Sequence, residues 1–382
     1  MLAIKNARVV LEYEVIDGGV ILVDGDRIVA VGTADDVSIP DSAEVYDAKG
    51  LYAGPGFVDI HVHGGNGHFF YANPIAAAEH FLAHGETTVL ATLYYDLPKD
   101  EFVASIERVK AAMGQGMAGN AIGGFYMEGP YMNPKYGASP EKNKWKGEIK
   151  TEDYTSVVEA AGEHAKVWAI APEREGLEPF LTKAKLVNPS TVFAVGHSEA
   201  TPAQVQALKK YGIGLQTHCM NATGRPECAG GTRSCGPDEA CLMDKDIYCE
   251  MICDSQGIHV AADMQQFIIS VKGIDKVILI SDSYVSDEPT PPQFAHITDL
   301  QFDANGGLCG SKLTLDKACA NVMKHVGCSV CDAFLMASRN PARAVGMGSE
   351  LGSITVGKRA DIVIVDDGFN VENVMLKGNF LR

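Results

Sequence analysis

The stretch GPGFVDIHVHGG, residues 54–65, is the part of the sequence that decides the fold. An apolar run ends here in two histidines, His61 and His63, which are followed directly by glycines. Side chains two residues apart in a β-strand project from the same face, so the two imidazoles can point together at one object. The stretch therefore predicts a buried strand whose end presents nitrogen ligands to a metal ion.

The composition is that of a globular protein large enough for a barrel. The chain has 382 residues, of which 46% are hydrophobic and 21% charged. Its formal net charge of −17 argues against nucleic acid and against an anionic membrane as partners, because both favour basic surfaces. The first residues lack the apolar core of a signal peptide and no apolar run is long enough to cross a bilayer, so we expect a cytoplasmic protein.

Short apolar runs alternate with helix-length segments through the middle of the chain. Eight such runs fit a (β/α)8 barrel, although a doubly wound open sheet explains the alternation almost as well. Because the ionisable residues stand at the ends of these runs, we favour the barrel. The predicted strands lie in GFVDIHVHG, TTVLATLYY, AIGGFYMEG, VWAIAPE, TVFAVGH, GIGLQTH, YCEMICDSQGIHV and KVILISDS.

Both ends of the chain have the pattern of short strands joined by tight turns. Asp24-Gly25 is a hairpin signal between two apolar stretches, and the last thirty or so residues return to alternating short strands. We expect residues 1–53 and 351–382 to build one small β-sandwich domain, and residues 54–350 to build the metal-dependent barrel. The predicted fold class is thus α/β, a TIM-type barrel with a β-sandwich domain formed by both termini.

Ionisable residues follow six of the predicted strands. In a barrel the carboxyl ends of all strands open onto one face, so these side chains converge. Taken singly, a histidine is more often a satisfied polar residue, and an acid at such a place can be a turn or cap residue. Together they would be penalised by burial unless they were paired or bound to a metal such as zinc or ferrous iron. The residues are His61, His63, Glu128, His197, His218, His259 and Asp282.

The order of several motifs resembles the N-acetylglucosamine-6-phosphate deacetylase family of the amidohydrolase superfamily. These motifs are GPGFVDIHVHGG, MEGPYMNP, VGHSEA, THCMNAT, ISDS and LGSITVGKRADIVIVD, and together they span nearly the whole chain. The resemblance implies a metal-dependent amide hydrolase that releases acetate from an N-acetylhexosamine 6-phosphate, with N-acetylglucosamine 6-phosphate favoured over N-acetylgalactosamine 6-phosphate. Two alternatives stay open: an amidohydrolase with a different amide as substrate, and a non-catalytic protein that binds a metal or a sugar phosphate.

The resemblance also implies which residues hold the metal. Glu128, His197 and His218 match the ligands of the principal ion, whereas His61 and His63 match a pair that binds a second ion in those relatives that possess it. One or two divalent ions per subunit, Zn²⁺ or Fe²⁺, are therefore expected. The catalytic aspartate of the family, expected beside the metal, corresponds to Asp282.

Further positions match residues that contact the substrate in the family. Arg225 matches an arginine that grips phosphate and that comes from the neighbouring subunit in relatives, so a sugar phosphate substrate and a homodimer are expected. Arginine suits this role because its planar fork makes paired bonds to phosphate oxygens. The other expected substrate contacts are Asn221, Ala222, His259, Leu308, Cys309 and Gly310.

The chain departs from the family pattern where the pocket touches the substrate. Ser139 stands where the family usually has a histidine that contacts the substrate carbonyl, and His68 is a candidate to replace it. The aromatic HFFYAN follows HGGNG in place of an acidic stretch, and Ser281-Asp282-Ser283 takes the place of the usual TDA. These changes leave the metal chemistry intact but bear on the identity of the sugar. Cys219 and Cys309 are expected to pack near the pocket.

Overall fold

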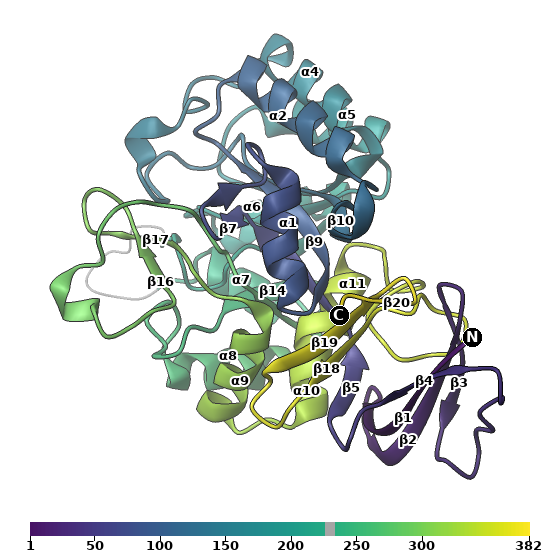
Figure 1. The fold of residues 1–382 in the computed structure, drawn as a ribbon. Helices are drawn as coiled ribbons and strands as arrows, with labels where there is room; N and C mark the ends of the chain where they lie inside the picture. The colour runs from purple at the N-terminus through teal and green to yellow at the C-terminus, as the bar shows by residue number, and fades with distance from the viewer. Residues whose placement is uncertain (226–233) are drawn as a thin grey trace.

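A barrel of eight parallel strands forms the centre of the computed structural model, which describes residues 1–225 and 234–382 (Figure 1). Each barrel strand pairs with the next one along the chain, as the right-handed β-α-β connections of such a barrel require. The strands are β6 (Phe57–Val62), β9 (Glu86–Tyr94), β10 (Ile122–Glu128), β11 (Ala165–Ile170), β12 (Val192–Val195), β13 (Ile213–Gln216), β14 (Tyr248–Ile252) and β15 (Val277–Ile280).

Backbone hydrogen bonds close the barrel between its first and last strands. The amide of Asp282 donates to the carbonyl of His61 over 3.0 Å, and the amide of His63 donates to the carbonyl of Ser283 over 2.9 Å. A doubly wound open sheet instead places the first strand of the chain in the middle and keeps two unpaired edge strands. The predicted (β/α)8 barrel is therefore confirmed.

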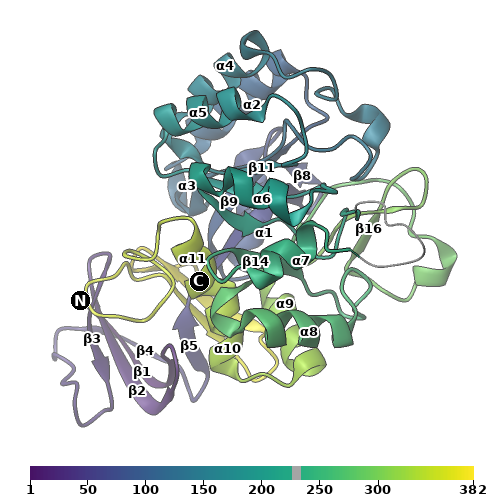
Figure 2. The ribbon, with the colours of Figure 1, turned by 180° about the vertical axis from the view of Figure 1, so that it is seen from behind.

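Helices cover the outside of the barrel. Helix α1 (Pro74–Ala83) shows how the sequence sets them: Asn73 caps its first turn, Pro74 stands at a position that needs no amide hydrogen, and Phe81 and Leu82 are buried. Figure 2 shows helices α6, α7 and α8 on the side turned away in Figure 1. Among the described residues no helix is long and apolar enough to span a membrane. The other helices between barrel strands are α2 (Lys99–Ala112), α3 (Gly116–Ala121), α4 (Thr151–Ala161), α5 (Leu177–Val187), α6 (Pro202–Leu208), α7 (Pro237–Met243) and α8 (Ala262–Lys272).

Helices α9 (Leu315–Val326), α10 (Val330–Phe334) and α11 (Asn340–Ala344) follow the last barrel strand. Between that strand and α9 lies a hairpin of β16 (Leu300–Phe302) and β17 (Leu308–Ser311). A second short hairpin, β7 (Gly64–Gly65) with β8 (His68–Phe69), follows the first barrel strand. In Figures 1 and 2 the two hairpins lie on the same side of the barrel.

The two chain ends build one β-sheet beside the barrel, which confirms a β-rich domain made from both termini. Strand β5 pairs in parallel with β1 and antiparallel with β18, so it joins the first strands of the chain to the last. The sheet branches at β1, which also pairs with β2 and β4. The domain limits at residues 53/54 and 350/351 stay a prediction. The strands are β1 (Leu2–Val10), β2 (Val15–Asp24), β3 (Arg27–Gly32), β4 (Glu44–Asp47), β5 (Tyr52–Pro55), β18 (Ile362–Val365), β19 (Val371–Leu376) and β20 (Asn379–Phe380).

Candidate metal centre

Six ionisable side chains meet at the carboxyl end of the barrel. They come from the ends of five strands that are far apart in the sequence, and none is more than 8% exposed. Charged groups this deeply buried need partners of opposite charge. The structure thus brings together six residues on which the sequence analysis concentrated: His61, His63, Glu128, His197, His218 and Asp282.

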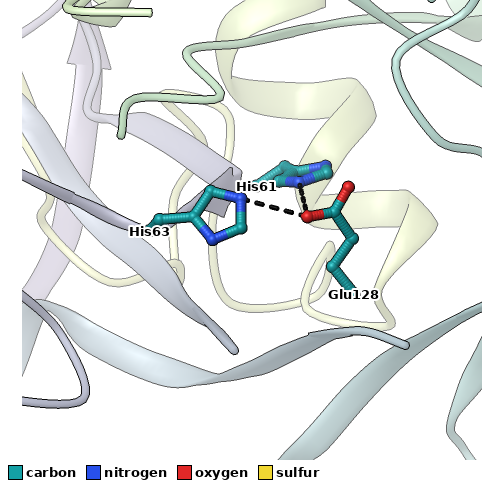
Figure 3. Close-up of side chains that lie close together, drawn as sticks. All are labelled: His61, His63 and Glu128. Atoms are coloured by element: carbon teal, nitrogen blue, oxygen red, sulfur yellow. Dashed lines mark ion pairs between the residues drawn. The ribbon is translucent and has the colours of Figure 1, made fainter. Parts of the chain in front are cut away.

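Glu128 stands between two pairs of histidines. Its Oε1 atom lies 2.7 Å from Nε2 of His197 and 3.1 Å from Nε2 of His218. Its Oε2 atom lies 3.1 Å from Nε2 of His63 and 3.6 Å from Nε2 of His61, and Figure 3 shows both rings turned toward this oxygen. Each carboxylate oxygen therefore faces one pair of imidazoles, so a single side chain can serve two neighbouring ion positions.

Asp282 lies on the side of the first histidine pair. Its Oδ1 atom is 3.4 Å from Nε2 of His63 and 3.6 Å from Nε2 of His61. Its own backbone is fixed by the hydrogen bond to His61 that closes the barrel. The carboxylate is thus held at the edge of the cluster, where it faces both the histidines and the cavity beyond them.

The donor atoms of this cluster fit a divalent metal. Two overlapping groups, His61 with His63 and Glu128, and Glu128 with His197 and His218, each bring their ligand atoms within 4.8 Å of one another. The Nε2 atom of His61 is buried and has no hydrogen-bond partner among the described residues. The Nε2 atoms of His197 and His218 face each other at 3.0 Å. Converging imidazole and carboxylate groups are the ligand set that zinc and related divalent ions bind.

The pKa shifts show that the cluster attracts positive charge. Burial lowers the pKa of His61, but the charges of Glu128 and Asp282 outweigh burial and hold this pKa well above its usual value. Burial raises the pKa of Glu128, but His61 and His197 outweigh it and hold that pKa well below its usual value. A site that stabilises bound protons in this way also favours a metal cation, and the two compete.

Three residues of the cluster have an unusual backbone conformation. The φ angles of His197, His218 and Asp282 are 45°, 25° and 46°, in the left-handed region that non-glycine residues rarely adopt. Such a conformation costs about 1–3 kcal/mol per residue and persists where the surrounding structure enforces it. The strain at three of the six cluster residues marks this end of the barrel as a functional site.

Two buried carboxylates support the histidines, and neither was predicted from the sequence. Asp59 accepts hydrogen bonds from the amides of His61 and Ser281, over 3.0 and 3.2 Å, and so ties the first barrel strand to the end of the last. Glu250 accepts hydrogen bonds from Nδ1 of His61 and from the amide of His218, both over 3.1 Å. A partner at Nδ1 orients the ring and leaves Nε2 for a ligand. The available signal was an acid inside an otherwise apolar strand, which burial forbids without a partner.

A cavity of about 280 Å³ opens above the cluster. His63, Glu128, His197, His218 and Asp282 form its floor. The tyrosines Tyr94 and Tyr284, which the sequence analysis did not single out, form part of its wall. Six of the predicted substrate contacts also line it: Asn221, Ala222, His259, Leu308, Cys309 and Gly310.

His259 lies in a loop and not at a strand end. Strand β14 ends at Ile252, seven residues earlier, which corrects the prediction that His259 directly follows a strand. Nδ1 of His259 is 3.0 Å from Oδ2 of Asp254, and its Nε2 is 3.1 Å from the carbonyl of Gly310. The Asp254 carboxylate also accepts bonds from the amides of Ile258 and His259. A compact loop around a buried carboxylate therefore carries His259 into the cavity wall.

The structure does not bring Arg225 into the cavity of its own chain. The Arg225 side chain is half exposed and its Nη2 atom lies 2.8 Å from Glu239. Neither Arg225 nor His68 is among the described residues that line the cavity. Ser139 lies outside this lining as well, whereas Cys219 is fully buried beside the cluster.

Comparisons with known proteins agree with this geometry. The N-acetylgalactosamine-6-phosphate deacetylase of Escherichia coli O157:H7 is 29% identical over 357 residues, which cover 89% of this chain and 90% of that protein. The N-acetylglucosamine-6-phosphate deacetylase of Bacillus subtilis (strain 168) is 28% identical over 392 residues, which cover 99% of this chain and 96% of that protein. A solved structure of an N-acetyl-D-glucosamine-6-phosphate deacetylase mutant from Mycobacterium smegmatis, in complex with N-acetyl-D-glucosamine-6-phosphate, matches with a TM-score of 0.82 at 27% identity and covers 99% of this chain and 98% of that one.

These similarities confirm the resemblance to the deacetylases that the sequence motifs indicated. The model of the Amidohydrolase family matches residues 52–381, which include the whole barrel and every residue of the cluster. The barrel, its buried histidines and acids, and this match agree with one another. The chain belongs to the amidohydrolase family.

Proposed function

We propose that this protein is a metal-dependent amide hydrolase that releases acetate from an N-acetylhexosamine 6-phosphate. The observation that carries the proposal is the position of Glu128 between two buried histidine pairs, with Asp282 at the edge of the cavity. N-acetylglucosamine 6-phosphate, which gives glucosamine 6-phosphate, is the preferred substrate. N-acetylgalactosamine 6-phosphate is the second candidate, because relatives named for each sugar are similarly identical to this chain, at 29% and 28%.

The metal ligands follow from the two donor groups. Glu128, His197 and His218 would hold one divalent ion, and His61 and His63, together with Glu128 and Asp282, would hold a second. Zn²⁺ and Fe²⁺ both suit imidazole with carboxylate. When bound, a divalent cation supplies Lewis acidity, which makes an amide carbonyl a better electrophile and water a better acid.

Asp282 is placed to move the protons of the reaction. Burial raises its pKa, but His61 and His63 outweigh burial and hold the pKa below its usual value, so the side chain is ionised at neutral pH. An ionised carboxylate can accept a proton from the attacking water and later return it to the departing amine nitrogen. The amine then leaves as a neutral group, which is the step that an amide otherwise resists.

Asn221, Ala222, His259 and the loop of Leu308, Cys309 and Gly310 would contact the sugar, because all of them line the cavity. In a chain with a net charge of −17, the phosphate needs a local cation. Arg225 would supply it to the cavity of a neighbouring copy, because it is half exposed and lies outside its own cavity. We accordingly propose a cytoplasmic homodimer that binds neither nucleic acid nor membranes.

The test is acetate release from N-acetylglucosamine 6-phosphate, measured beside its galacto epimer and the unphosphorylated sugar. We expect release from a phosphorylated sugar only, its loss on chelation, and its return when Zn²⁺ or Fe²⁺ is added back. Arg225→Met should weaken turnover of the phosphorylated sugar, whereas Arg343→Met, at a similarly exposed arginine near the β-rich domain, should not. If metal-loaded protein releases acetate from none of these sugars, the proposed reaction is wrong and a different amide or a purely binding role replaces it.

A further inference from the structure

A second cavity of about 170 Å³ adjoins the catalytic one. We call it the annex and define it by Phe69, Tyr71, Ser139, Glu288 and Asp303, which line it and not the catalytic cavity. The two cavities share four wall residues, so they lie directly beside each other. The shared residues are Tyr94, Ala138, Tyr284 and Cys309.

Two of the three departures from the family pattern line the annex. Phe69 and Tyr71 belong to the aromatic stretch HFFYAN, and Ser139 stands at the position of the missing histidine. The third departure, at Ser281 and Ser283, does not line the annex, although the next residue, Tyr284, does. Two segments that are distant in the sequence thus change together around one space. The serine leaves room that a histidine would fill, and the aromatic residues form a wall for it.

A chain of aromatic rings leads from the histidine cluster into the annex. The ring of Tyr284 lies 5.4 Å from that of His63. The ring of Phe69 meets Tyr284 edge-on at 5.0 Å and stacks on Tyr71 at 4.7 Å. Aromatic rings offer flat, rigid surfaces at low entropic cost, and tyrosine adds a hydroxyl at its tip. The annex therefore presents a ready platform to a flat-faced group.

Polar side chains complete the annex. Asp96, Glu288 and Asp303 contribute carboxylates, and Lys142 contributes an amine. Carboxylates accept hydrogen bonds from hydroxyl groups, whereas an apolar acyl chain would take them out of water without replacing those bonds. Three carboxylates against one amine also disfavour a second anionic group. Aromatic faces together with carboxylates suit a pyranose ring, which has C–H faces and a rim of hydroxyl groups.

We propose that the annex binds a second sugar, so that the preferred substrate is an N-acetylhexosamine 6-phosphate with a neutral glycosyl substituent on its anomeric carbon. This inference rests on the proposed deacetylase function. The anomeric carbon adjoins the carbon that bears the amide, so a substituent there starts close to the metal cluster, where Tyr94 and Tyr284 flank His63. Water still cleaves only the amide C–N bond, acetate and the free amine are the products, and the glycosidic bond stays intact.

The experiment compares kcat/KM for acetate release from two compounds. One is N-acetylglucosamine 6-phosphate, and the other is the disaccharide in which the anomeric carbon of this sugar is β-linked to glucose. We expect the disaccharide to be preferred about tenfold, the size of effect that one good aromatic contact provides. Ser139→His, which fills the annex, and Tyr71→Ala, which removes half of the ring stack, should both abolish this preference without reducing turnover of the monosaccharide. The matched controls are Ser42→His and Phe267→Ala, at exposed positions that line neither cavity.

The outcomes separate this inference from the proposed function. The annex does not bind a second sugar if the monosaccharide is deacetylated and the disaccharide has no higher kcat/KM. The same conclusion follows if Ser139→His and Tyr71→Ala both still prefer the disaccharide. In either case the deacetylase proposal stands. If metal-loaded protein deacetylates neither compound, the proposed function fails, and the inference fails with it. A tenfold preference that both annex variants remove and both controls keep supports the inference.

Discussion

The catalytic cavity and the annex share a wall but are built from different parts of the chain. The reactive side chains of the catalytic cavity stand at the ends of barrel strands and are at most 8% exposed. The annex is lined by loops: the β7–β8 hairpin contributes Phe69, the segment after β10 contributes Ser139, and the β16–β17 hairpin contributes Asp303. Glu288 at its rim is exposed. The barrel strands thus position the reactive side chains of the catalytic cavity, whereas surface loops form most of the annex.

Because of this difference, we expect the barrel strands to determine the reaction and the loops to determine which substrate is preferred. The strand ends are held by the hydrogen bonds of the barrel, so the distances around Glu128 depend on the whole fold. Loops can change length and side chains without disturbing the strands that they join. The motifs of the metal cluster match the amidohydrolase pattern apart from Ser281 and Ser283 beside Asp282, whereas the other departures, HFFYAN and Ser139, lie outside the barrel strands. If this division holds, substitutions in the metal cluster should reduce turnover of the monosaccharide most, and substitutions in the annex should reduce it least.

Glu128→Gln should have the largest effect. Glutamine keeps the shape of the side chain but removes the charge that faces both histidine pairs, so neither ion position retains its shared ligand. The loss of several kcal/mol of charge stabilisation corresponds to a fall in kcat of about 10⁴-fold or more. Metal content, determined on the same sample, should fall as well. Turnover within tenfold of the unchanged protein would show that Glu128 is not shared between two ions. The basic reaction would then not depend on the centre of the cluster.

Asp282→Asn should have the next largest effect and should separate proton transfer from metal binding. Asparagine can neither take a proton from water nor deliver one to the amine, and general acid–base groups contribute about 10²–10⁴-fold to rate. We expect kcat for N-acetylglucosamine 6-phosphate to fall about 10³-fold while metal content stays the same, since four histidines and Glu128 remain. Normal turnover would remove Asp282 from the mechanism.

Much of the barrel could be predicted because its strands are buried on both faces. Such strands appear in the sequence as continuous apolar runs, and each of the eight runs that were identified contains a barrel strand, although β14 ends well before the end of its run. The rule that barrel strands open onto one face was then enough to place the histidines together. The β-rich domain was harder, since only the pairing of β5 with β18 shows that both ends of the chain share one sheet.

The missing parts of the site depend on partners that are remote in the sequence. Glu250 supports His61 from 189 residues away, and no local pattern signals that pairing. His259 was recognised, but its loop depends on how Asp254 gathers backbone amides, so its distance from the strand was not predictable. The annex forms only where five segments that are separate in the sequence approach one another. Sequence patterns report periodicity and local chemistry, whereas these features arise from tertiary packing.

Asp254→Asn should have an intermediate effect, because Asp254 acts through His259. The substitution weakens the acceptor of the His259 ring, so His259 is less well oriented toward the substrate. Supporting carboxylates of this kind are worth about 10–100-fold at metal-site histidines, and we expect kcat/KM to fall about tenfold here, mainly through KM. Asp316→Asn is the matched control, since Asp316 is another buried carboxylate that faces a histidine, His84 at 3.3 Å, but lines neither cavity. A change in kcat alone would contradict the positioning role.

The same carboxylate should give a pH-dependent stability. Burial raises the pKa of Asp254, but hydrogen bonds from His259 and from the loop amides outweigh it and lower the pKa to about 2. A pKa lowered by folding stabilises the protein fully above the ordinary pKa of about 4, and this stabilisation is lost as the pH falls toward 2. The melting temperature of Asp254→Asn should thus lie several degrees below that of the unchanged protein at pH 7, and the gap should narrow below about pH 4. A gap that is constant with pH would show that the charge of Asp254 is not what stabilises the loop.

Glu288→Gln should have the smallest effect on the basic reaction. Glu288 lies at the exposed rim of the annex and does not line the catalytic cavity. Substitutions at such positions usually change free energies by less than about 0.5 kcal/mol, so kcat/KM for N-acetylglucosamine 6-phosphate should stay within about twofold, as for the exposed Glu175→Gln. With the glycosyl-substituted sugar, loss of one carboxylate acceptor should cost a few-fold. A tenfold loss with the monosaccharide would mean that loop residues also govern the basic reaction, because no contact with the cluster could account for it.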